Sequence, residues 1–449
     1  MMKLSFYGGA QEVTGANYLL ETEKTKILVD CGLFQCPDFC SIENYQPFRY
    51  DPSQIDALLV THAHIDHTGR IPKLISEGFA GKIYSTAPTR DFAGLMLEDS
   101  IGVLEKEAKN SLREVYYREI DVKNALTRWE AVDVGQEFTI GDMKITVGDA
   151  GHVLGSAMYT VTHGERNVLF SGDLGNAPNQ LLPEHSWPKD ITHMLIESAY
   201  GDRVHENVRE RRDKLERVIE DTIKRGGTLM IPAFALERTQ ELLFELNELI
   251  EHGRIPSVPI FLDSPLAIKA TAIYKKYSGF YNKSARDHMK VDGDLFQFPK
   301  LKFTLTSQES RQINAVPAPK IIIAGAGMMH GGRILHHAKR YLPDPKNAIL
   351  FIGYLAANSL GRRIFEGARE VTIHGEKIPV RATAKAIGGY SAHADHEALL
   401  EFVNHTRDTL NTVFVVQGEL KAGLFLSQRI KDYLGVDSIV PKLGDSFEL

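Results

Sequence analysis

Three histidines and an aspartate crowd the segment THAHIDH, which directly follows the apolar run ALLV. Side chains two apart on a strand point the same way, so His62 and His64 are expected to approach one ion together. Asp66 and His67 lie at the turn into a predicted helix, where they can face a second ion. Imidazole and carboxylate groups are ligands that suit zinc or manganese. The segment therefore predicts one wall of a metal site.

Three further residues of metal-binding type stand alone at the ends of other apolar strands. They are Asp30 in LVDCG, His152 in DAGHVLGS and Asp173 in FSGDLGN. Each is flanked by glycine, which lets backbone and ligand approach closely. One such residue alone is usually a turn or surface residue, but their recurrence beside HAHIDH predicts a shared site. Asp173 is the best candidate for a carboxylate that bridges two ions.

The composition limits the kinds of protein that this chain can be. With 449 residues, of which 43% are hydrophobic, it is long enough for two or more domains. A net charge of −6 excludes a uniformly basic coat for nucleic acid, although it allows a local basic cleft. We find neither a signal peptide nor an apolar run of about 18 residues, which predicts no membrane span and a cytoplasmic location.

Three cysteines, Cys31, Cys36 and Cys40, lie close together in the sequence. They lack paired CxxC spacing and a nearby histidine, so reduced thiols near a site are a better interpretation than a metal cluster. A disulfide framework is not expected, which fits a reducing compartment.

The order of strands and helices predicts one α/β domain inserted into another. Residues 1–204 contain mainly short strands, with helices near 69–77 and over most of 88–129. Between 205 and 368, four apolar strands alternate with helices: TLMIPAF, PIFLDSP, KIIIAGA and AILFIGY. This alternation predicts a parallel sheet with covered faces. The strand-rich pattern resumes over 369–449, which is expected to complete the first domain.

HAHIDH with these outlying residues resembles the metallo-β-lactamase fold, an αββα sandwich with two metals between its sheets. The inserted domain, with ESAYGDR before it and GGYSAHAD after it, is similar to that of the β-CASP nucleases. IPAFALERTQE, FLDSP and AGAGMMHGGRILHH look typical of the bacterial RNA-cleaving members, which are related to the mRNA 3′-end-processing endonuclease. The resemblance covers nearly the whole chain. It implies an α/β protein, a metallo-β-lactamase αββα sandwich with an inserted parallel β-CASP domain.

The resemblance also implies two divalent metal ions, with zinc expected and manganese as the alternative at the second position. One ion would be held by three histidines: His62, His64 and His152. The other would be held by Asp66 and His67, with Asp173 bridging the two. Asp30 would orient the ligands without binding a metal itself. Catalysis would depend on Asp66 and on a pair formed by Glu197, in ESAYGDR, and His393, in SAHAD, with His393 as the general acid.

One position departs from the family pattern. RNA-acting β-CASP members carry a histidine in their third motif, where it completes the second metal site, and DNA-acting members commonly carry a valine. The matching stretch here is VVQGEL, which places Gln417 at this position. Gln417 could bind a metal weakly through its amide oxygen or could hydrogen-bond a water at the metal. A register one residue earlier, on Val416, would give the DNA-type residue.

The implied function is hydrolysis of single-stranded RNA phosphodiesters by a metal-activated hydroxide, as an endonuclease, with an additional 5′-exonuclease activity left open. Three alternatives stay open. The first is a DNA nuclease of the same architecture, favoured by Gln417. The second is a small-ester hydrolase, which the large insertion disfavours. The third is a metal-depleted RNA-binding protein without catalytic activity.

Two residues of the inserted domain are candidates for substrate binding. Arg333 lies in the first turn after a glycine-rich loop, where the N–H groups of a helix N-terminus can receive a phosphate. Ser264 follows an apolar strand, at the end where ligands of parallel sheets gather. The loop lacks the GK[ST] sequence of a nucleotide-triphosphate site, so no nucleotide cofactor is expected. A homodimer through the amphipathic segment AGLFLSQRIKDYL is a further expectation, although that segment could instead pack on its own domain.

Overall fold

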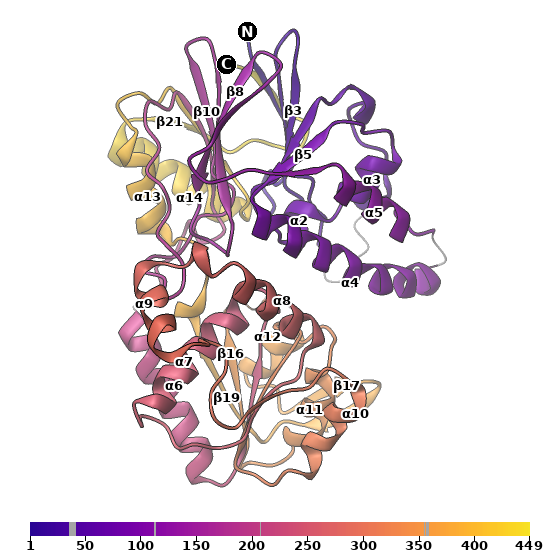
Figure 1. The fold of residues 1–449 in the computed structure, drawn as a ribbon, viewed down its shortest axis with the longest axis vertical. Helices are drawn as coiled ribbons and strands as arrows, with labels where there is room; N and C mark the ends of the chain where they lie inside the picture. Colours follow the sequence, from indigo (N-terminus) through magenta and orange to yellow (C-terminus); the bar gives the residue numbers. More distant parts are fainter. Residues whose placement is uncertain (36–41, 112–113, 207, 354, 356–358) are drawn as a thin grey trace. The chain divides into compact units, whose positions relative to one another are not determined.

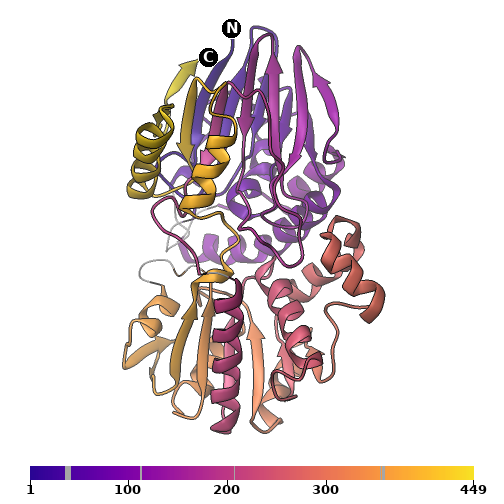
Figure 2. The same cartoon turned by 90° about the vertical axis from the view of Figure 1, so that its left-hand side faces the viewer.

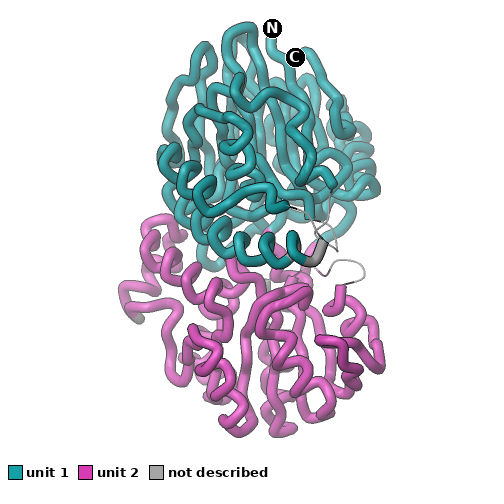
Figure 3. The backbone as a smooth tube through the Cα atoms, turned by 90° about the vertical axis from the view of Figure 1, so that its right-hand side faces the viewer, with its two compact units in different colours: residues 1–204, 393–449 teal, residues 205–392 magenta. Residues whose placement is uncertain are grey.

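The chain divides by its contacts into two compact units (Figure 3). In this computed structural model, the described residues are 1–35, 42–111, 114–206, 208–353, 355 and 359–449. Unit 1 comprises residues 1–204 and 393–449, and unit 2 comprises residues 205–392. The chain therefore leaves unit 1 once and returns to it, as expected for an insertion.

Unit 1 is built on two seven-stranded sheets. The first sheet has the order β22 (Ser446–Glu448), β1 (Lys3–Gly8), β2 (Asn17–Glu21), β3 (Lys26–Val29), β4 (Ala57–Leu59), β5 (Lys82–Ser85) and β6 (Trp129–Ala131). The second has the order β21 (Asp437–Ile439), β20 (Thr412–Val416), β11 (His193–Glu197), β10 (Arg166–Phe170), β9 (Ala157–His163), β8 (Met143–Asp149) and β7 (Glu137–Ile140).

The two sheets of unit 1 face one another across a shared apolar core. Phe6 and Val29 of the first sheet belong to the same buried cluster as Phe170 and Phe414 of the second. The alternate side chains of the second sheet form another cluster, with Phe402 and other residues of the helices outside that sheet. Interior strands such as β11 are buried on both faces, and their sequences are therefore nearly continuously apolar.

Helices complete the outer layers of unit 1 (Figure 1). The N-terminal helices are α1 (Ile42–Tyr45), α2 (Ile65–Thr68), α3 (Ile71–Ser76), α4 (Ala87–Ser111) and α5 (Glu119–Thr127), and the C-terminal ones are α13 (His396–His405) and α14 (Leu420–Arg429). Figure 1 shows α13 and α14 on one side of the paired sheets and α3, α4 and α5 on the other. This four-layer αββα arrangement confirms the predicted fold of unit 1.

Unit 2 contains a six-stranded sheet in which every neighbouring pair is parallel. Its order is β14 (Leu301–Phe303), β13 (Ile260–Leu262), β15 (Lys320–Ala324), β12 (Thr228–Pro232), β16 (Ala348–Ile352) and β19 (Thr383–Ile387). The helices are α6 (Val208–Lys224), α7 (Arg238–Glu251), α8 (Pro265–Lys276), α9 (Lys283–Asp292), α10 (Ser307–Gln312), α11 (Ile334–Tyr341) and α12 (Leu360–Phe365). The long helix α6 lies along this sheet (Figure 2). The four apolar strands expected from the sequence are all present, which confirms the parallel sheet.

The second limit of the inserted unit differs from the expected one. The sequence predicted a return to the first domain at residue 369, but unit 2 continues to Ala392. The reason is that β19 pairs in parallel with β16 along its whole length, from Thr383 beside Ala348 to Ile387 beside Ile352. Between them, β17 (Glu370–Ile373) and β18 (Glu376–Pro379) form a separate antiparallel pair. The local pattern of apolar residues does not show which distant strands pair, so the pairing of β19 with β16 could not be predicted from it.

None of the helices among the described residues is long and apolar enough to cross a membrane.

A buried ionic cluster fixes the last segment of unit 2. Arg211 of α6 is 3% exposed and donates to Glu241 Oε1 at 3.0 Å and to the carbonyl of Gly389 at 3.2 Å. Its guanidinium lies 4.3 Å from the ring centre of Tyr390, whose hydroxyl donates to the fully buried Glu245. The cluster joins α6 and α7 to the GGY segment that ends unit 2. A buried charge is tolerated only when it is paired and hydrogen-bonded in this way.

Replacing Arg211 should therefore destabilise the protein strongly. Arg211→Met would remove the buried cation that contacts both Glu241 and Glu245, and would leave them only the partly shared Arg238 and Arg212. Breaking a buried pair costs about 3–5 kcal/mol. Urea unfolding should show a clearly lower midpoint. Arg209→Met, at an exposed position of the same helix, is the matched control and should unfold as the wild type does. Equal midpoints for the two variants would contradict the account of this cluster.

Candidate metal centre

HAHIDH lies at the carboxyl end of β4, the strand between β3 and β5 in the first sheet of unit 1. The chain leaves β4 after Leu59, and α2 begins at Ile65, so His62 and His64 occupy the connection. His67 is in the single turn of α2, where its N–H donates to the carbonyl of His64 at 3.0 Å. The short turn places Asp66 and His67 next to the strand end that carries His62.

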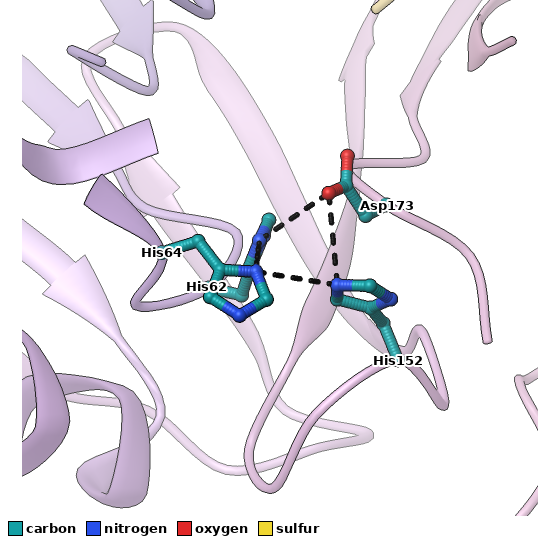
Figure 4. Close-up of side chains that lie close together, drawn as sticks. All are labelled: His62, His64, His152 and Asp173. Atoms are coloured by element: carbon teal, nitrogen blue, oxygen red, sulfur yellow. Dashed lines mark hydrogen bonds and ion pairs between the residues drawn. The ribbon is translucent and has the colours of Figure 1, made fainter. Parts of the chain in front are cut away.

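Four side chains bring their ligand atoms together at this strand end (Figure 4). They are His62, His64, His152 and Asp173, and their ligand atoms all lie within 4.8 Å of one another. His64 Nδ1 is 3.0 Å from His62 Nε2 and 3.4 Å from His152 Nε2. Asp173 Oδ2 is 3.4 Å from His62 Nε2 and 3.6 Å from His152 Nε2. His152 follows β8 and Asp173 follows β10, so both sheets contribute to the cluster.

This donor set fits one divalent cation. A tetrahedral ion with bonds of the usual length needs ligand atoms about 3.3–3.6 Å apart, which is close to the spacing found here. His62 is fully buried, and burial together with the neighbouring His67 lowers its pKa well below its ordinary value. A neutral imidazole has a lone pair to offer, as metal ligation requires. Three histidine nitrogens and a carboxylate oxygen are typical zinc ligands.

Asp30 and Thr61 hold His67 in place. Asp30 is buried with a φ of 57°, and its Oδ2 accepts from His67 Nδ1 at 2.7 Å. The same carboxylate accepts from the backbone N–H and the hydroxyl of Thr61, each at 2.8 Å. His67 Nε2 then points toward Asp173 Oδ1, at 3.3 Å, while Asp66 Oδ2 is 4.0 Å away. Asp30 thus lies where an orienting residue should. The sequence analysis did not single out Thr61. Its position between the apolar run ALLV and His62 was the available sign that it supports the site.

Gln417 lies beside His67, in the position that the third motif predicted. It follows β20 with a φ of 48° and is 3% exposed. Its amide nitrogen is 3.0 Å from His67 Nε2 and donates to the carbonyl of Val13 at 3.2 Å. Its amide oxygen accepts from the hydroxyl of Tyr18 at 3.3 Å. The amide therefore turns its N–H groups, and not its oxygen, toward the predicted second metal position.

Glu197 and His393 form a pair next to Asp173. Glu197 ends β11 and is fully buried, and its Oε1 accepts from the backbone N–H of Leu174 at 2.7 Å. His393 Nδ1 is 3.1 Å from Glu197 Oε2 and 3.8 Å from Asp173 Oδ2. Burial raises the pKa of Glu197, and the neighbouring His393 opposes that rise. An antiparallel bridge between His393 and Gly175 adds a backbone contact to this arrangement.

Arg333 and Ser264, the two candidates for substrate binding, are engaged within unit 2. Arg333 donates to Asp263 Oδ1 at 2.7 Å and to the carbonyls of Thr304 and Leu305 at 2.8 Å. Ser264 caps α8 by accepting from the N–H of Ala267 at 3.3 Å. These contacts are structural, and the proposed role in substrate binding stays a prediction.

Asp263 is the residue of this region that the sequence reasoning missed. Its carboxylate is buried at the end of β13 and also accepts from Ser310, Thr304 and His337. Burial alone would raise the pKa of Asp263, but these hydrogen bonds and the one from Arg333 hold it at about 2. The sequence did contain a signal for this role, because a buried aspartate directly after an apolar strand needs several hydrogen-bond donors.

Cys31 is a free and buried thiol, and burial raises its pKa to about 12. Its backbone N–H donates to the carbonyl of His67 at 2.8 Å, so it lies behind the site as a packed residue. Cys36 and Cys40 lie outside the described residues.

Three family models match the chain in the order expected for an insertion. The metallo-β-lactamase superfamily matches residues 11–225, and the β-CASP domain matches residues 239–364. The Zn-dependent metallo-hydrolase RNA specificity domain matches residues 377–441. Together they cover the residues that form the metal cluster and the Glu197–His393 pair.

Several characterised proteins are similar along nearly the whole chain. Ribonuclease TTHA0252 of Thermus thermophilus is 37% identical over 404 residues, which span 90% of each chain. The transcription termination factor FttA is 33% identical in Methanosarcina mazei, over 97% of this chain and 70% of that protein. The factor from Thermococcus kodakarensis is 34% identical, over 100% of this chain and 71% of that protein.

A solved structure shares the fold. It is a protein of unknown function from Enterococcus faecalis, with a TM-score of 0.59 and 12% sequence identity over 100% of both chains. At this identity the likeness concerns the fold alone. The family models and the identity to curated relatives go further, and they show that the chain is a metal-dependent hydrolase that belongs to the β-CASP family of metallo-β-lactamase-fold RNA-processing nucleases.

Proposed function

We propose that this protein hydrolyses phosphodiester bonds of single-stranded RNA, with a divalent metal ion held by His62, His64, His152 and Asp173. The observation that carries the proposal is the convergence of these four ligand atoms beside a paired glutamate and histidine. The match to an RNA specificity domain and the similarity to a named ribonuclease support RNA as the polymer. Zinc is the preferred ion, because three imidazoles and one carboxylate suit it better than magnesium or calcium.

The bound ion would supply Lewis-acid stabilisation of the negative charge that develops on the phosphoryl group. The protein's own residues provide the rest of the chemistry. His62, His152 and Asp173 are at most 3% exposed, so these ligands of the ion are buried and held in fixed positions. Fixed ligands in a water-poor site act more strongly on developing charge than groups in bulk water do.

The Glu197–His393 pair is suited to deliver a proton to the leaving oxygen. Because His393 Nδ1 lies 3.1 Å from Glu197 Oε2, the carboxylate fixes the ring and stabilises its protonated form. His393 is 26% exposed on its side chain, which is enough for exchange with water or substrate. A positioned general acid of this kind typically contributes about 10²–10⁴-fold to the rate. Cleavage by water in this way would leave 5′-phosphate and 3′-hydroxyl ends.

Several finer points stay predictions. They are the balance of endonucleolytic and 5′-exonucleolytic cleavage, manganese in place of zinc, a cytoplasmic location and a homodimer. For the homodimer, α14 buries Ala422, Gly423, Leu426 and Ser427 on its own unit and leaves Leu420 and Leu424 exposed. The amphipathic C-terminal segment therefore serves mainly the packing of unit 1.

DNA cleavage is the second candidate function, favoured by Gln417 in the third motif.

End-labelled single-stranded RNA and DNA of one sequence should distinguish the two candidates. With zinc supplied, we expect cleavage of RNA to fragments that carry 3′-hydroxyl ends, because the proposed nucleophile is water. His152→Ala, which removes one metal ligand, is the control for contaminating nucleases and should lose this cleavage. Gel electrophoresis of the products also separates internal cleavage from stepwise removal of nucleotides.

Two results would contradict the proposal as stated. Cleavage of DNA with intact RNA would favour the DNA nuclease. Cleavage of neither polymer would favour a small-ester hydrolase or a binding protein, and turnover of a small ester would identify the former.

The pair of Glu197 and His393 should behave as one unit. His393→Ala is expected to lower the rate of RNA cleavage about 10²–10⁴-fold, as for loss of a general acid. Glu197→Gln should also lower it, and the double variant should be little worse than His393→Ala alone, because residues that act together are not additive. His405→Ala, at an exposed position at the end of α13, is the control and should keep the wild-type rate. Additive losses in single-turnover assays would show that the two residues act separately.

A further inference from the structure

The predicted second metal position is where the geometry of this chain departs from its family. We propose that the protein binds one metal ion per chain, in the His62, His64, His152 and Asp173 set, and that the amide of Gln417 closes the second position. The inference rests on the ligand assignment in the proposed function and deepens it by giving the number of ions. It concerns a departure that belongs to this chain, since the family pattern has a histidine where Gln417 stands.

A second ion would need a lone pair on His67 Nε2. The other ring nitrogen, Nδ1, is committed to Asp30 Oδ2 at 2.7 Å. Nε2 has two close neighbours, Gln417 Nε2 at 3.0 Å and Asp173 Oδ1 at 3.3 Å. The nearer of these neighbours is an amide nitrogen, which lies where a second ion would have to approach Nε2.

The orientation of the Gln417 amide is set by its other partners. Its nitrogen donates to the carbonyl of Val13 at 3.2 Å, and its oxygen accepts from Tyr18 at 3.3 Å. Turning the amide over would bring its oxygen against the Val13 carbonyl, where two acceptors would face each other without a proton. An amide N–H group cannot bind a cation. The side chain at 417 thus presents hydrogens where the second ion requires a ligand.

The surroundings leave Gln417 little room to move away. The residue is 3% exposed, and its backbone N–H donates to the carbonyl of Gly9 at 2.8 Å. A Cβ placed on Gly9 would lie only 2.0 Å from the amide oxygen of Gln417, so the backbone of Gly9 passes directly over the amide. If Gln417 left its pocket, its buried hydrogen-bond partners would stay unpaired, and each unpaired group costs free energy. The amide is therefore a fixed part of the site.

Metal stoichiometry tests the inference without any measurement of cleavage. The full chain, stripped of metal, is dialysed against dilute zinc, and its zinc is then counted by mass spectrometry. We expect about one zinc ion per wild-type chain, in keeping with a single four-ligand site. His67→Ala should still bind about one ion, since His67 holds none, whereas His62→Ala should lose the bound zinc. Two ions in the wild type and one in His67→Ala would overturn the inference.

Placing a metal ligand at position 417 should allow the chain to bind the second ion, which complements the loss of zinc expected for His62→Ala. Gln417→His should raise the content to about two ions per chain, and histidine tolerates the positive φ of this position better than most residues do. Gln417→Glu has the shape of the original side chain but carries a carboxylate, so it guards against a failure of the histidine variant to fold. Circular dichroism checks that both are folded. A content of one ion in both folded variants would show that Gln417 does not close the second position.

The same proteins, assayed for RNA cleavage, separate this inference from the proposed function. Two ions in a wild-type enzyme that cleaves RNA would overturn the single-ion inference and leave the ribonuclease function in place. One ion in a protein that cleaves no RNA would support the inference and overturn the function. Titration with cobalt in place of zinc adds a spectroscopic check. The visible absorption of the tetrahedral cobalt site should stop increasing once one ion per chain has been added.

Discussion

A single carboxylate, that of Asp173, organises the site on which the function depends. Its oxygens lie between 3.3 and 3.8 Å from ring nitrogens of four histidines: His62, His67, His152 and His393. Burial would raise its pKa, but the surrounding histidines hold it well below its ordinary value. A buried carboxylate is stable only with such partners. Asp173 thereby fixes the distances among histidines that come from three different segments of the chain.

The two sheets of unit 1 deliver these groups to one place. His62 and His64 follow β4 of the first sheet. In the second sheet, Asp173 and Gln417 follow β10 and β20, and Glu197 ends β11. These three strands are neighbours and run in parallel, so their carboxyl ends meet at the same edge. The apolar core between the sheets holds the two edges together. The ligands are thus positioned by strands and not by long loops, which favours a fixed geometry.

Much of this could be predicted from the sequence, because local patterns carry it. Residues that directly follow apolar strands, such as His152 and Asp173, mark strand ends that meet in space, and these positions were found. The place of β19 was not found, because pairing with β16 depends on contacts between distant segments. The internal partners of Arg333 and the direction of the Gln417 amide could not be foreseen either. Both depend in part on hydrogen bonds to backbone carbonyls, those of Thr304 and Leu305 for Arg333 and that of Val13 for Gln417, and such bonds leave no trace in residue type.

The central claim, a single metal ion held by three histidines and Asp173, is tested most directly by diffraction from zinc-loaded crystals at the zinc absorption edge. The account predicts one anomalous peak per chain, about 2.0–2.2 Å from the nitrogens of His62, His64 and His152 and from an oxygen of Asp173. The amide nitrogen of Gln417 should remain within hydrogen-bond distance of His67. A second peak between Asp66 and His67, or a single peak away from the four ligands, would contradict it.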